Sequence, residues 1–306
     1  LVGSEMCIRD RVKEERRMRV ENQPYGRLNE IIYEHAFTTH PYRHPTIGSM
    51  ADLEAASIAD VREFHQTFYV PENATVTVVG DFDAAEASQL VNRYFARVQK
   101  ASKPVPRALP KEPAQNKERR VTVEEGWPLP AVVVAYHVTY DGHPDAYPLH
   151  ITSKILSDGQ SARIPRELVY TKRLALTAFG AGNITEDPNL FYAVAIVQPG
   201  QSPQAVERAL IEEFEKLKRE PVLETELQRE KNQFARDYIV GRESNQEKAM
   251  HLAHAAVIHN DITTADGEFE IFTNVSVDDV QRVARTYFNG TNRVVLHIVP
   301  REGASR

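Results

Sequence analysis

Two stretches of this chain, 219 residues apart, share one pattern of side chains, and this internal repeat constrains the fold more than any other feature. Each begins with a serine that opens a helical pattern, reaches a threonine and two aromatic residues, and continues through an asparagine into an apolar run. The matching positions are Ser57, Asp60, Val61, 67–69, Asn73 and 76–79 in the first stretch and Ser276, Asp279, Val280, 286–288, Asn292 and 295–298 in the second. The repeat predicts two related domains, each with a helix, a turn and a strand in the same register.

The repeat also predicts how much of each domain the chain holds. The second domain begins near Arg119, so an equally long first domain would begin about 100 residues before Leu1. We therefore expect the first domain to be incomplete. Residues 1–11 (LVGSEMCIRDR) lack helical and strand periodicity and resemble translated sequencing adapter, so we interpret them as a non-native segment. A frayed natural terminus is the alternative.

A proline-rich segment separates the two domains. Residues 100–119 (KASKPVPRALPKEPAQNKER) contain four prolines, many charges and almost nothing to bury. Such a composition predicts an extended, solvated linker. The segment divides 12–99, the C-terminal part of the first domain, from 120–306, the second domain.

The periodicity of the apolar residues predicts helices and strands that are grouped rather than strictly alternating. Helices are expected at 12–21, 25–37, 59–68, 84–98, 146–156, 162–170, 203–219, 224–241, 246–260 and 277–286. Strands are expected at 75–79, 121–124, 131–138, 175–180, 191–197 and 294–299. This grouping favours an α+β fold in which helices cover one face of a mainly antiparallel sheet.

Composition narrows the classes of function. The chain has 306 residues, of which 42% are hydrophobic and 26% charged, as expected of a globular protein with two domains. A net charge of −6 argues against nucleic acid as the main partner. No apolar run reaches about 18 residues, so no membrane span is expected. Cys7 is the only cysteine, which excludes disulfides within the chain and thiolate metal sites.

A charged helical segment at 12–18 (VKEERRM) and four short motifs after it resemble one protein family. The motifs are 22–26 (NQPYG), 40–48 (HPYRHPTIG), 69–73 (YVPEN) and 80–82 (GDF). In order and spacing they resemble the pitrilysin (insulinase-like, M16) zinc metallopeptidases and their M16B branch, over nearly all of residues 12–299. The resemblance implies two homologous LuxS/MPP-like metallohydrolase domains, the first incomplete.

The resemblance also implies a zinc site of which this chain carries one part. In the family, two histidines of an HxxEH helix bind zinc, the Glu of that motif is the general base, and a Glu on a later helix is the third protein ligand. On that match Glu15 is the zinc ligand, with Glu14 as the alternative if the register shifts by one. The HxxEH motif is expected upstream of residue 1. Without the family resemblance, the same segment would be interpreted as an exposed charged helix with ion pairs between residues one turn apart.

The implied function is zinc-dependent hydrolysis of peptide bonds in peptides or unfolded polypeptides, by a subunit whose 306-residue form is inactive on its own. The alternative is a non-catalytic M16-like subunit that holds structure or substrate in a heterodimer. No signal peptide is visible in the sequence. Because bacterial members of the family are often exported, the resemblance favours the bacterial periplasm over the cytoplasm as the location of this protein.

Two histidines lie in the second of these motifs. His40 and His44 have the spacing of a helical metal pair, but Pro41 and Pro45 prevent the helix that would align them. We interpret both histidines as residues that structure a loop.

A rival metal site is possible near the C-terminal end of the chain. Glu247, His251 and His254 would lie on one face of the helix expected at 246–260. The internal repeat maps His251 and His254 onto a half-buried helix face of the first domain. Packed or surface histidines are therefore the interpretation that we favour over metal ligands.

One departure from the family bears on partners. Residues 158–176 resemble a family stretch, GxSSRLYxxLRxxxxLxY, in which an Arg and a Tyr hold the substrate backbone and stabilise the developing oxyanion. The corresponding residues here are Val169 and Leu176, and neither side chain donates a hydrogen bond. Some bacterial members of the family divide zinc and the Arg/Tyr pair between two subunits. The departure therefore implies a homologous M16 partner subunit that supplies the pair.

Overall fold

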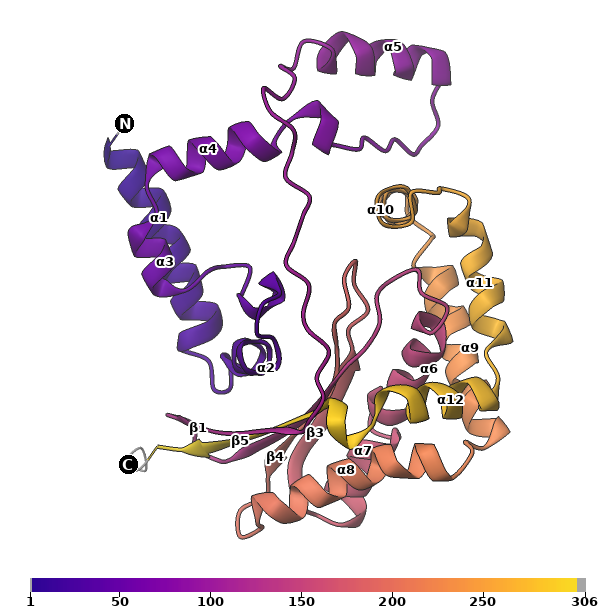
Figure 1. The fold of residues 1–306 in the computed structure, drawn as a ribbon. Helices are drawn as coiled ribbons and strands as arrows, with labels where there is room; N and C mark the ends of the chain where they lie inside the picture. The colour runs from indigo at the N-terminus through magenta and orange to yellow at the C-terminus, as the bar shows by residue number, and fades with distance from the viewer. Residues whose placement is uncertain (1, 302–306) are drawn as a thin grey trace.

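The computed structural model describes residues 2–301, in which one five-stranded sheet lies beneath an open array of helices (Figure 1). The strands are β1 (Arg119–Glu125), β2 (Ala131–His137), β3 (Ala175–Gly182), β4 (Leu190–Val197) and β5 (Arg293–Pro300). Their order across the sheet is β1-β5-β2-β4-β3. β1 pairs with β5 in parallel, and every other neighbouring pair is antiparallel. The α+β prediction with a mainly antiparallel sheet is confirmed.

The helices fall into two groups. Those that precede the sheet are α1 (Val2–Arg16), which continues as a π-helix over Arg17–Glu21, α2 (Leu28–Ala36), α3 (Met50–Ala55), α4 (Ile58–Phe68) and α5 (Ala84–Phe95). Those of the second half are α6 (Ala146–Ser157), α7 (Arg163–Pro165) with a π-helix over Arg166–Thr171, α8 (Pro203–Arg219), α9 (Glu224–Val240), α10 (Asn245–Ile258), α11 (Thr264–Asn274) and α12 (Val277–Tyr287).

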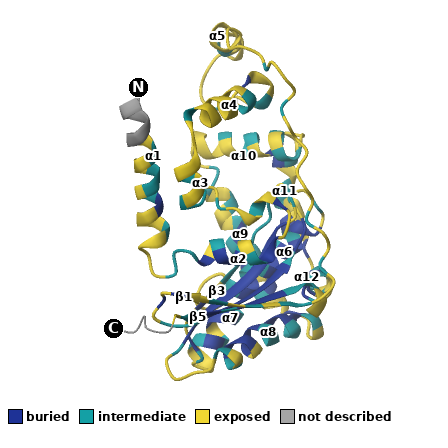
Figure 2. Ribbon diagram, turned by 60° about the vertical axis from the view of Figure 1, so that its left-hand side comes forward, coloured by how far each residue is buried: buried dark blue, intermediate teal, exposed yellow. Residues whose placement is uncertain are grey.

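The central strands β2 and β4 are buried on both faces, which explains why they read as continuous apolar runs. Alternate residues of β2, such as Val132 and Val134, face a cluster with side chains of α6, α8 and α12. Their neighbours Val133 and Ala135 face a second cluster with Leu28, Ile31, Ile32, Ala36 and Phe37, from α2 and the residue after it. The sheet of the second half is therefore covered on one face by its own helices and on the other by a helix of the first half (Figure 2).

Aromatic residues strengthen the contact between the halves. The ring centroid of Tyr25 lies 4.8 Å from that of Trp127, which is buried beside the sheet. The Tyr25 hydroxyl donates a hydrogen bond to the backbone carbonyl of Leu129 at 3.2 Å. Because these side chains come from both halves, α2 and the second half share one core.

The internal repeat is confirmed in the geometry of its turns. Ser57 and Ser276 both cap their helices through reciprocal hydrogen bonds with the aspartate three residues later. After each helix an asparagine side chain donates back to the carbonyl of the first aromatic residue, from Asn73 at 3.0 Å and from Asn292 at 2.8 Å. The two units therefore agree in structure as well as in sequence from the helix cap to the turn.

The strand predicted at 75–79 is wrong. Residues 74–79 form no strand, whereas the equivalent residues of the second half form most of β5. The physical reason is pairing: β5 lies between β1 and β2, but none of the five strands in residues 2–301 pairs with 74–79. β-branched residues favour a strand only where neighbouring strands complete the hydrogen bonds.

Three details of the secondary structure differ from expectation. Helix α1 runs from Val2 through Arg16, whereas the helix expected there begins at residue 12. Helices α3 and α11 were not anticipated. α3 begins with a capping box between Ser49 and Asp52, and this S-x-x-D signal is present in the sequence.

The segment 100–119 is extended, as expected, but part of it is attached to both halves rather than free in solvent. The Glu112 carboxylate accepts hydrogen bonds from the backbone N–H groups of Thr38, Thr39 and His40, at 2.8, 2.9 and 3.0 Å. Burial raises the pKa of Glu112, but these hydrogen bonds outweigh burial and bring the pKa to about 2. Gln115 donates to the backbone carbonyl of Arg293 at 2.8 Å.

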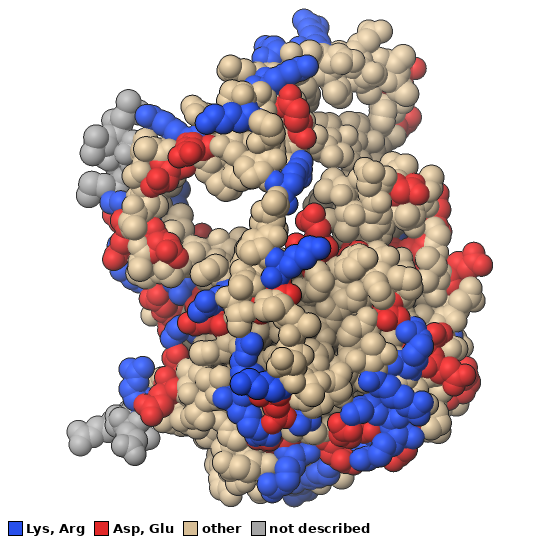
Figure 3. All heavy atoms as spheres, viewed as in Figure 1, with Lys and Arg blue, Asp and Glu red and all other residues tan. Residues whose placement is uncertain are grey.

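The surface carries charges of both signs. Figure 3 shows Lys and Arg side chains interspersed with Asp and Glu over the face in view, with openings between the helices of the first half and the rest of the molecule. Within residues 2–301, none of the helices is both long and apolar enough to cross a membrane.

Candidate functional site

Helix α1 presents the predicted zinc ligand on its open side. The Glu15 carboxylate pairs with Arg19 one turn later at 3.1 Å, and Glu14 pairs with Arg17 at 3.2 Å. Both glutamates thus make the intrahelical ion pairs expected of a charged helix. The opposite face of α1 contacts α3, through an ion pair of 3.1 Å between Lys13 and Glu54.

Arg16 anchors α1 to the rest of the first half. Its guanidinium is buried and donates two hydrogen bonds to the Glu30 carboxylate, at 2.6 and 2.9 Å, and one to the backbone carbonyl of Gly48 at 2.8 Å. The bonds to Glu30 raise the pKa of Arg16 and keep it charged. The anchor fixes the rotation of the helix about its axis, and with it the direction in which Glu15 points.

The residues described do not complete a zinc site around Glu15. Among the side chains that the structure describes, those of residues 8–301, the one group of His, Cys, Asp or Glu close enough to hold a metal ion is elsewhere, and it includes neither Glu15 nor Glu14. A structural zinc ion needs four ligands and a catalytic one three from the protein. This chain by itself therefore does not fit a zinc ion at Glu15, and no chemical step through zinc follows from its geometry.

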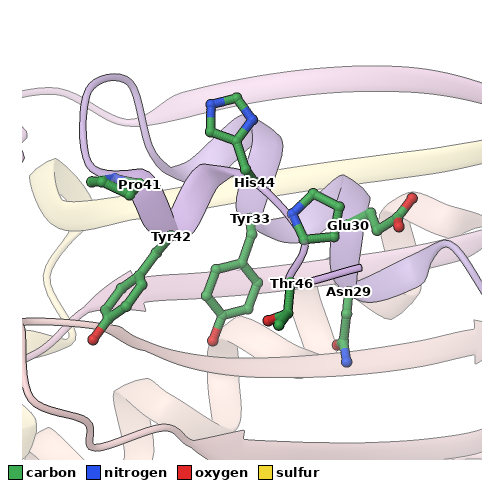
Figure 4. Close-up of a pocket in the computed structure, with 8 residues that line it drawn as sticks. Asn29, Glu30, Tyr33, Pro41, Tyr42, His44 and Thr46 are labelled. Carbon is green, nitrogen blue, oxygen red and sulfur yellow. The ribbon is translucent and has the colours of Figure 1, made fainter. Parts of the chain in front are cut away.

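The histidine motif 40–48 lines a pocket of about 490 Å³ against α2. Figure 4 shows Tyr33 and Tyr42 pointing the same way, whereas His44 points to the opposite side. The two hydroxyls meet the second half: Tyr33 accepts from the Asn183 amide at 2.6 Å, and Tyr42 accepts from the backbone N–H of Asp187 at 3.2 Å. Burial raises the pKa of Tyr33, so its hydroxyl stays protonated.

Both histidines of this motif lie in a loop, at the ends of the 3₁₀ turn Pro41–Arg43. His40 is buried, and its Nδ1 accepts from the backbone N–H of Tyr42 at 3.2 Å, which fixes the start of the turn. His44 is exposed. Neither histidine belongs to the group of described residues that could hold a metal ion.

The three residues of the rival metal site on α10, Glu247, His251 and His254, contact different partners instead of one another. Glu247 accepts a 2.8 Å hydrogen bond from Ser244 at the helix N-terminus. His251 lies 3.1 Å from the carbonyl of Ala265, within contact of Arg242. His254 instead faces Asp141, with its Nε2 2.7 Å from a carboxylate oxygen.

Asp141 and His259 complete the group that sequence reasoning missed. Together with His254 their ligand atoms all lie within 4.8 Å of one another. Asp141 follows the buried strand β2, more than 100 residues before the histidines. No spacing rule links residues so far apart, so no signal in the sequence singles out Asp141.

The positions of the expected Arg/Tyr pair do come together. Val169 and Leu176 line one pocket of about 380 Å³ with Tyr170 and Arg173. Val169 packs against the core, and Leu176 on β3 is largely exposed. An arginine and a tyrosine at these two positions would face the same space. Val169 and Leu176 themselves donate no hydrogen bond to it, whereas Tyr170 and Arg173 beside them carry donors.

Comparison with known protein families and structures places this fold among zinc peptidases. The sequence-family model of the peptidase M16 inactive domain matches residues 55–234. The chain therefore belongs to the peptidase M16 family. It is 32% identical to the zinc protease PqqE of Helicobacter pylori over 94% of this chain and 65% of that protein. It is 23% identical to an uncharacterized zinc protease of Mycobacterium tuberculosis, over 90% of this chain and 63% of that protein.

Solved structures agree with this placement. A protease from Helicobacter pylori matches with a TM-score of 0.90 and 31% identity, over 97% of this chain and 72% of the other. A peptidase M16 inactive domain from Pseudomonas fluorescens matches with a TM-score of 0.84 and 16% identity, over 98% of this chain and 71% of the other, which shows the shared fold. The chain thus spans somewhat less than two thirds of the length of the relatives matched by sequence, 65% and 63%.

Proposed function

We propose that this chain is part of a zinc-dependent endopeptidase subunit that cleaves peptides or unfolded polypeptides, with Glu15 as one zinc ligand. The observation that carries the proposal is the 32% identity to the Helicobacter pylori zinc protease over 94% of this chain. The fold supports it, since a protease from the same organism matches with a TM-score of 0.90.

Geometry at α1 supports the choice of Glu15. The Arg16 anchor fixes the rotation of α1, and among the described residues the ion-pair partner of Glu15 is Arg19 on the same helix. A carboxylate held in this way remains available to an incoming metal ion. In such enzymes the metal lowers the pKa of its bound water and polarises the substrate carbonyl. The two histidine ligands and the general base would come from an HxxEH motif, which residues 1–306 do not contain.

The gene offers the first test. We expect an HxxEH motif about 75 residues before Glu15, the separation that the family resemblance implies. Substituted residues at the motif positions would contradict the catalytic proposal.

The second test is biochemical. In a protein that carries both the motif and this chain, Glu15→Gln should abolish zinc-dependent hydrolysis of an unfolded peptide, whereas Glu14→Gln should retain it. Glu14 is the matched control because it lies next to Glu15 and makes the same kind of ion pair. Activity in both variants would overturn the ligand assignment. The 306-residue chain alone should show no zinc-dependent cleavage, and robust cleavage would overturn the roles proposed.

One observation favours a second candidate, a non-catalytic subunit that holds the substrate for a partner. At the two positions where the family places an Arg and a Tyr, this chain has Val169 and Leu176, whose side chains donate no hydrogen bond. A homologous M16 subunit with an intact pair would supply what this chain lacks. Mixing the two subunits and measuring peptide cleavage separates the candidates. Glu15→Gln abolishes cleavage by the mixture if this chain carries the zinc, and leaves it unchanged if this chain is the scaffold.

A further inference from the structure

We infer that Asp141, His254 and His259 form a binding site for a divalent transition-metal ion, best matched to Zn²⁺, at the C-terminal end of α10. This site is separate from Glu15, lies in the second half of the molecule, and does not depend on the proposed peptidase function. Imidazole nitrogen and carboxylate oxygen are the ligands that Zn²⁺ takes beside thiolate.

The three side chains converge from two segments. Asp141 lies in the turn after β2, where its backbone N–H donates to the carbonyl of Thr185 at 2.8 Å. Its Oδ2 lies 2.7 Å from His254 Nε2 and its Oδ1 lies 3.1 Å from His259 Nε2. Ligand atoms about 2.1 Å from a tetrahedral ion lie about 3.4 Å apart. A small opening of the two contacts would admit the ion between the carboxylate and both rings.

The hydrogen bond on the far side of His259 determines which of its ring nitrogens can bind a cation. His259 Nδ1 lies 2.8 Å from Thr264 Oγ1, and that hydroxyl donates its single hydrogen to the carbonyl of Asp261 at 2.8 Å. The hydroxyl therefore accepts from an N–H at Nδ1. In neutral His259 the lone pair is then on Nε2, where it faces a carboxylate oxygen. Two lone pairs repel each other unless a metal ion or a second proton lies between them.

The hydroxyl of Thr264 is thus the outer partner that metal-binding histidines have, because it fixes the tautomer and the direction of the ring. His259 also follows the last residue of α10, whose C-terminal carbonyls favour a positive charge.

The exposure of the three side chains indicates whether the site is closed or open to solvent. His259 and Asp141 are largely buried, with side chains 14% and 22% exposed, whereas the side chain of His254 is 49% exposed. Three protein ligands with one side open to solvent leave a coordination position for water or a small anion. Glu247 and His251 lie on the same helix but have other partners, so the site has three protein ligands.

A bound ion would join α10 to the turn after β2. Half of the residues of α10 are exposed, and Ala255 is the one buried residue of this helix. Figures 1 and 2 show α10 at the edge of the second half that is nearest to α4, and Gly80 of the first half lies beside the Asn245 side chain at the start of α10. The ion would therefore brace the element of the second half that faces the first.

The test is Zn²⁺ binding by the metal-free 306-residue chain, measured by titration calorimetry and metal analysis. We expect one Zn²⁺ per chain with a Kd of about 10 μM or lower. Asp141→Asn, His254→Gln and His259→Gln should each weaken binding by at least about tenfold. His65→Gln, the control variant, should bind like the parent. A Kd weaker than about 10 μM, or equal binding by the Asp141 variant, would overturn the site.

Thr264 gives a sharper test, since it would not touch the ion. Thr264→Val should weaken Zn²⁺ binding about tenfold to a hundredfold, and Thr264→Ser should restore it. The melting temperature without metal should change little, because Thr264 is on the surface. Added Zn²⁺ should raise the melting temperature of the parent chain and not that of His259→Gln. An equal rise in both would overturn the inference. None of these measurements involves peptidase activity, so they test the metal site even if the proposed peptidase function is wrong.

Discussion

The helix and the turn of the repeated unit fold alike in the two copies and are buried very differently. Val280 and Phe288 of the second half are 0% exposed, whereas their counterparts Val61 and Tyr69 are 61% and 67% exposed. The serine caps and the asparagine turns are nevertheless the same in both. The helix and the turn thus depend on local sequence, while burial depends on what the rest of the chain brings to them (Figure 2).

What covers α12 in the second half is the sheet with its flanking helices. Phe288 packs against Tyr136, Phe191 and Phe214, with ring centroids 5.2, 4.9 and 4.9 Å away. Those three rings come from β2, β4 and α8. In the first half, Tyr69 stacks on His65 of its own helix at 4.9 Å. The same aromatic position is therefore a core residue in one copy and a surface residue in the other.

The largest expected difference is in local stability. Amide hydrogen exchange of α12 should require global unfolding, with an opening free energy of about 5–15 kcal/mol. Exchange of α4 and α5 should need only about 1 kcal/mol, because no core holds these helices in place. Exchange measured by mass spectrometry on proteolytic fragments tests both values. Equal protection would show that a second molecule covers α4 in solution, and dilution of the sample should then remove the protection.

Paired aromatic truncations sharpen the comparison. Phe288→Ala should lower the free energy of unfolding by about 3–5 kcal/mol, since it removes a fully buried ring and leaves a cavity. Tyr69→Ala should change it by less than about 0.5 kcal/mol. Urea unfolding followed by circular dichroism provides both numbers. Similar losses in the two variants would mean that the first copy also has a core.

Paired cap substitutions should have a smaller effect. Ser276→Ala should lower the free energy of unfolding by about 1 kcal/mol, because Ser276 caps a helix that unfolds with the core. Ser57→Ala removes the same hydrogen bonds from α4 and should leave global unfolding unchanged while reducing the helical signal of the native state. The comparison fails if Ser57→Ala costs as much global stability as Ser276→Ala.

The smallest expected effect is a pH dependence at the segment between the copies. The pKa of Glu112 is about 2 in the folded chain against a usual 4.5, so its ionised form is favoured by folding. Its contribution is fully present above pH 4.5 and is lost as the pH falls toward 2. Glu112 is partly in solvent, which limits the effect to below about 1 kcal/mol. Thermal melts should show a weaker pH dependence for Glu112→Gln than for the parent, and identical profiles would contradict this prediction.

Local signals made most of the fold predictable. The apolar runs of β2 and β4 and the serine before α12 can be read without a structure. The strand at 75–79 could not be judged in this way, because pairing with other strands decides whether β-branched residues form one. The attachment of Glu112 to residues 38–40 depends on a contact between segments more than 70 residues apart.

The candidate sites also divide into one that the sequence indicates and one that depends on the fold. The charged segment around Glu15 was recognisable by its resemblance to a family, and it is helical as expected, within a helix that begins earlier, at Val2. The group of Asp141, His254 and His259 could not be anticipated, since the fold alone brings the turn after β2 to the end of α10.

Trp127, the only tryptophan in the chain, offers an optical signal for the contact between the halves. Its indole is buried with side chains of α2 on one side and of the sheet on the other. Ultraviolet excitation at wavelengths that tyrosine does not absorb therefore reports on a single indole at this junction. If α2 leaves the sheet while the second half stays folded, the emission of the indole shifts to longer wavelength as water reaches it, before the circular dichroism of the core changes.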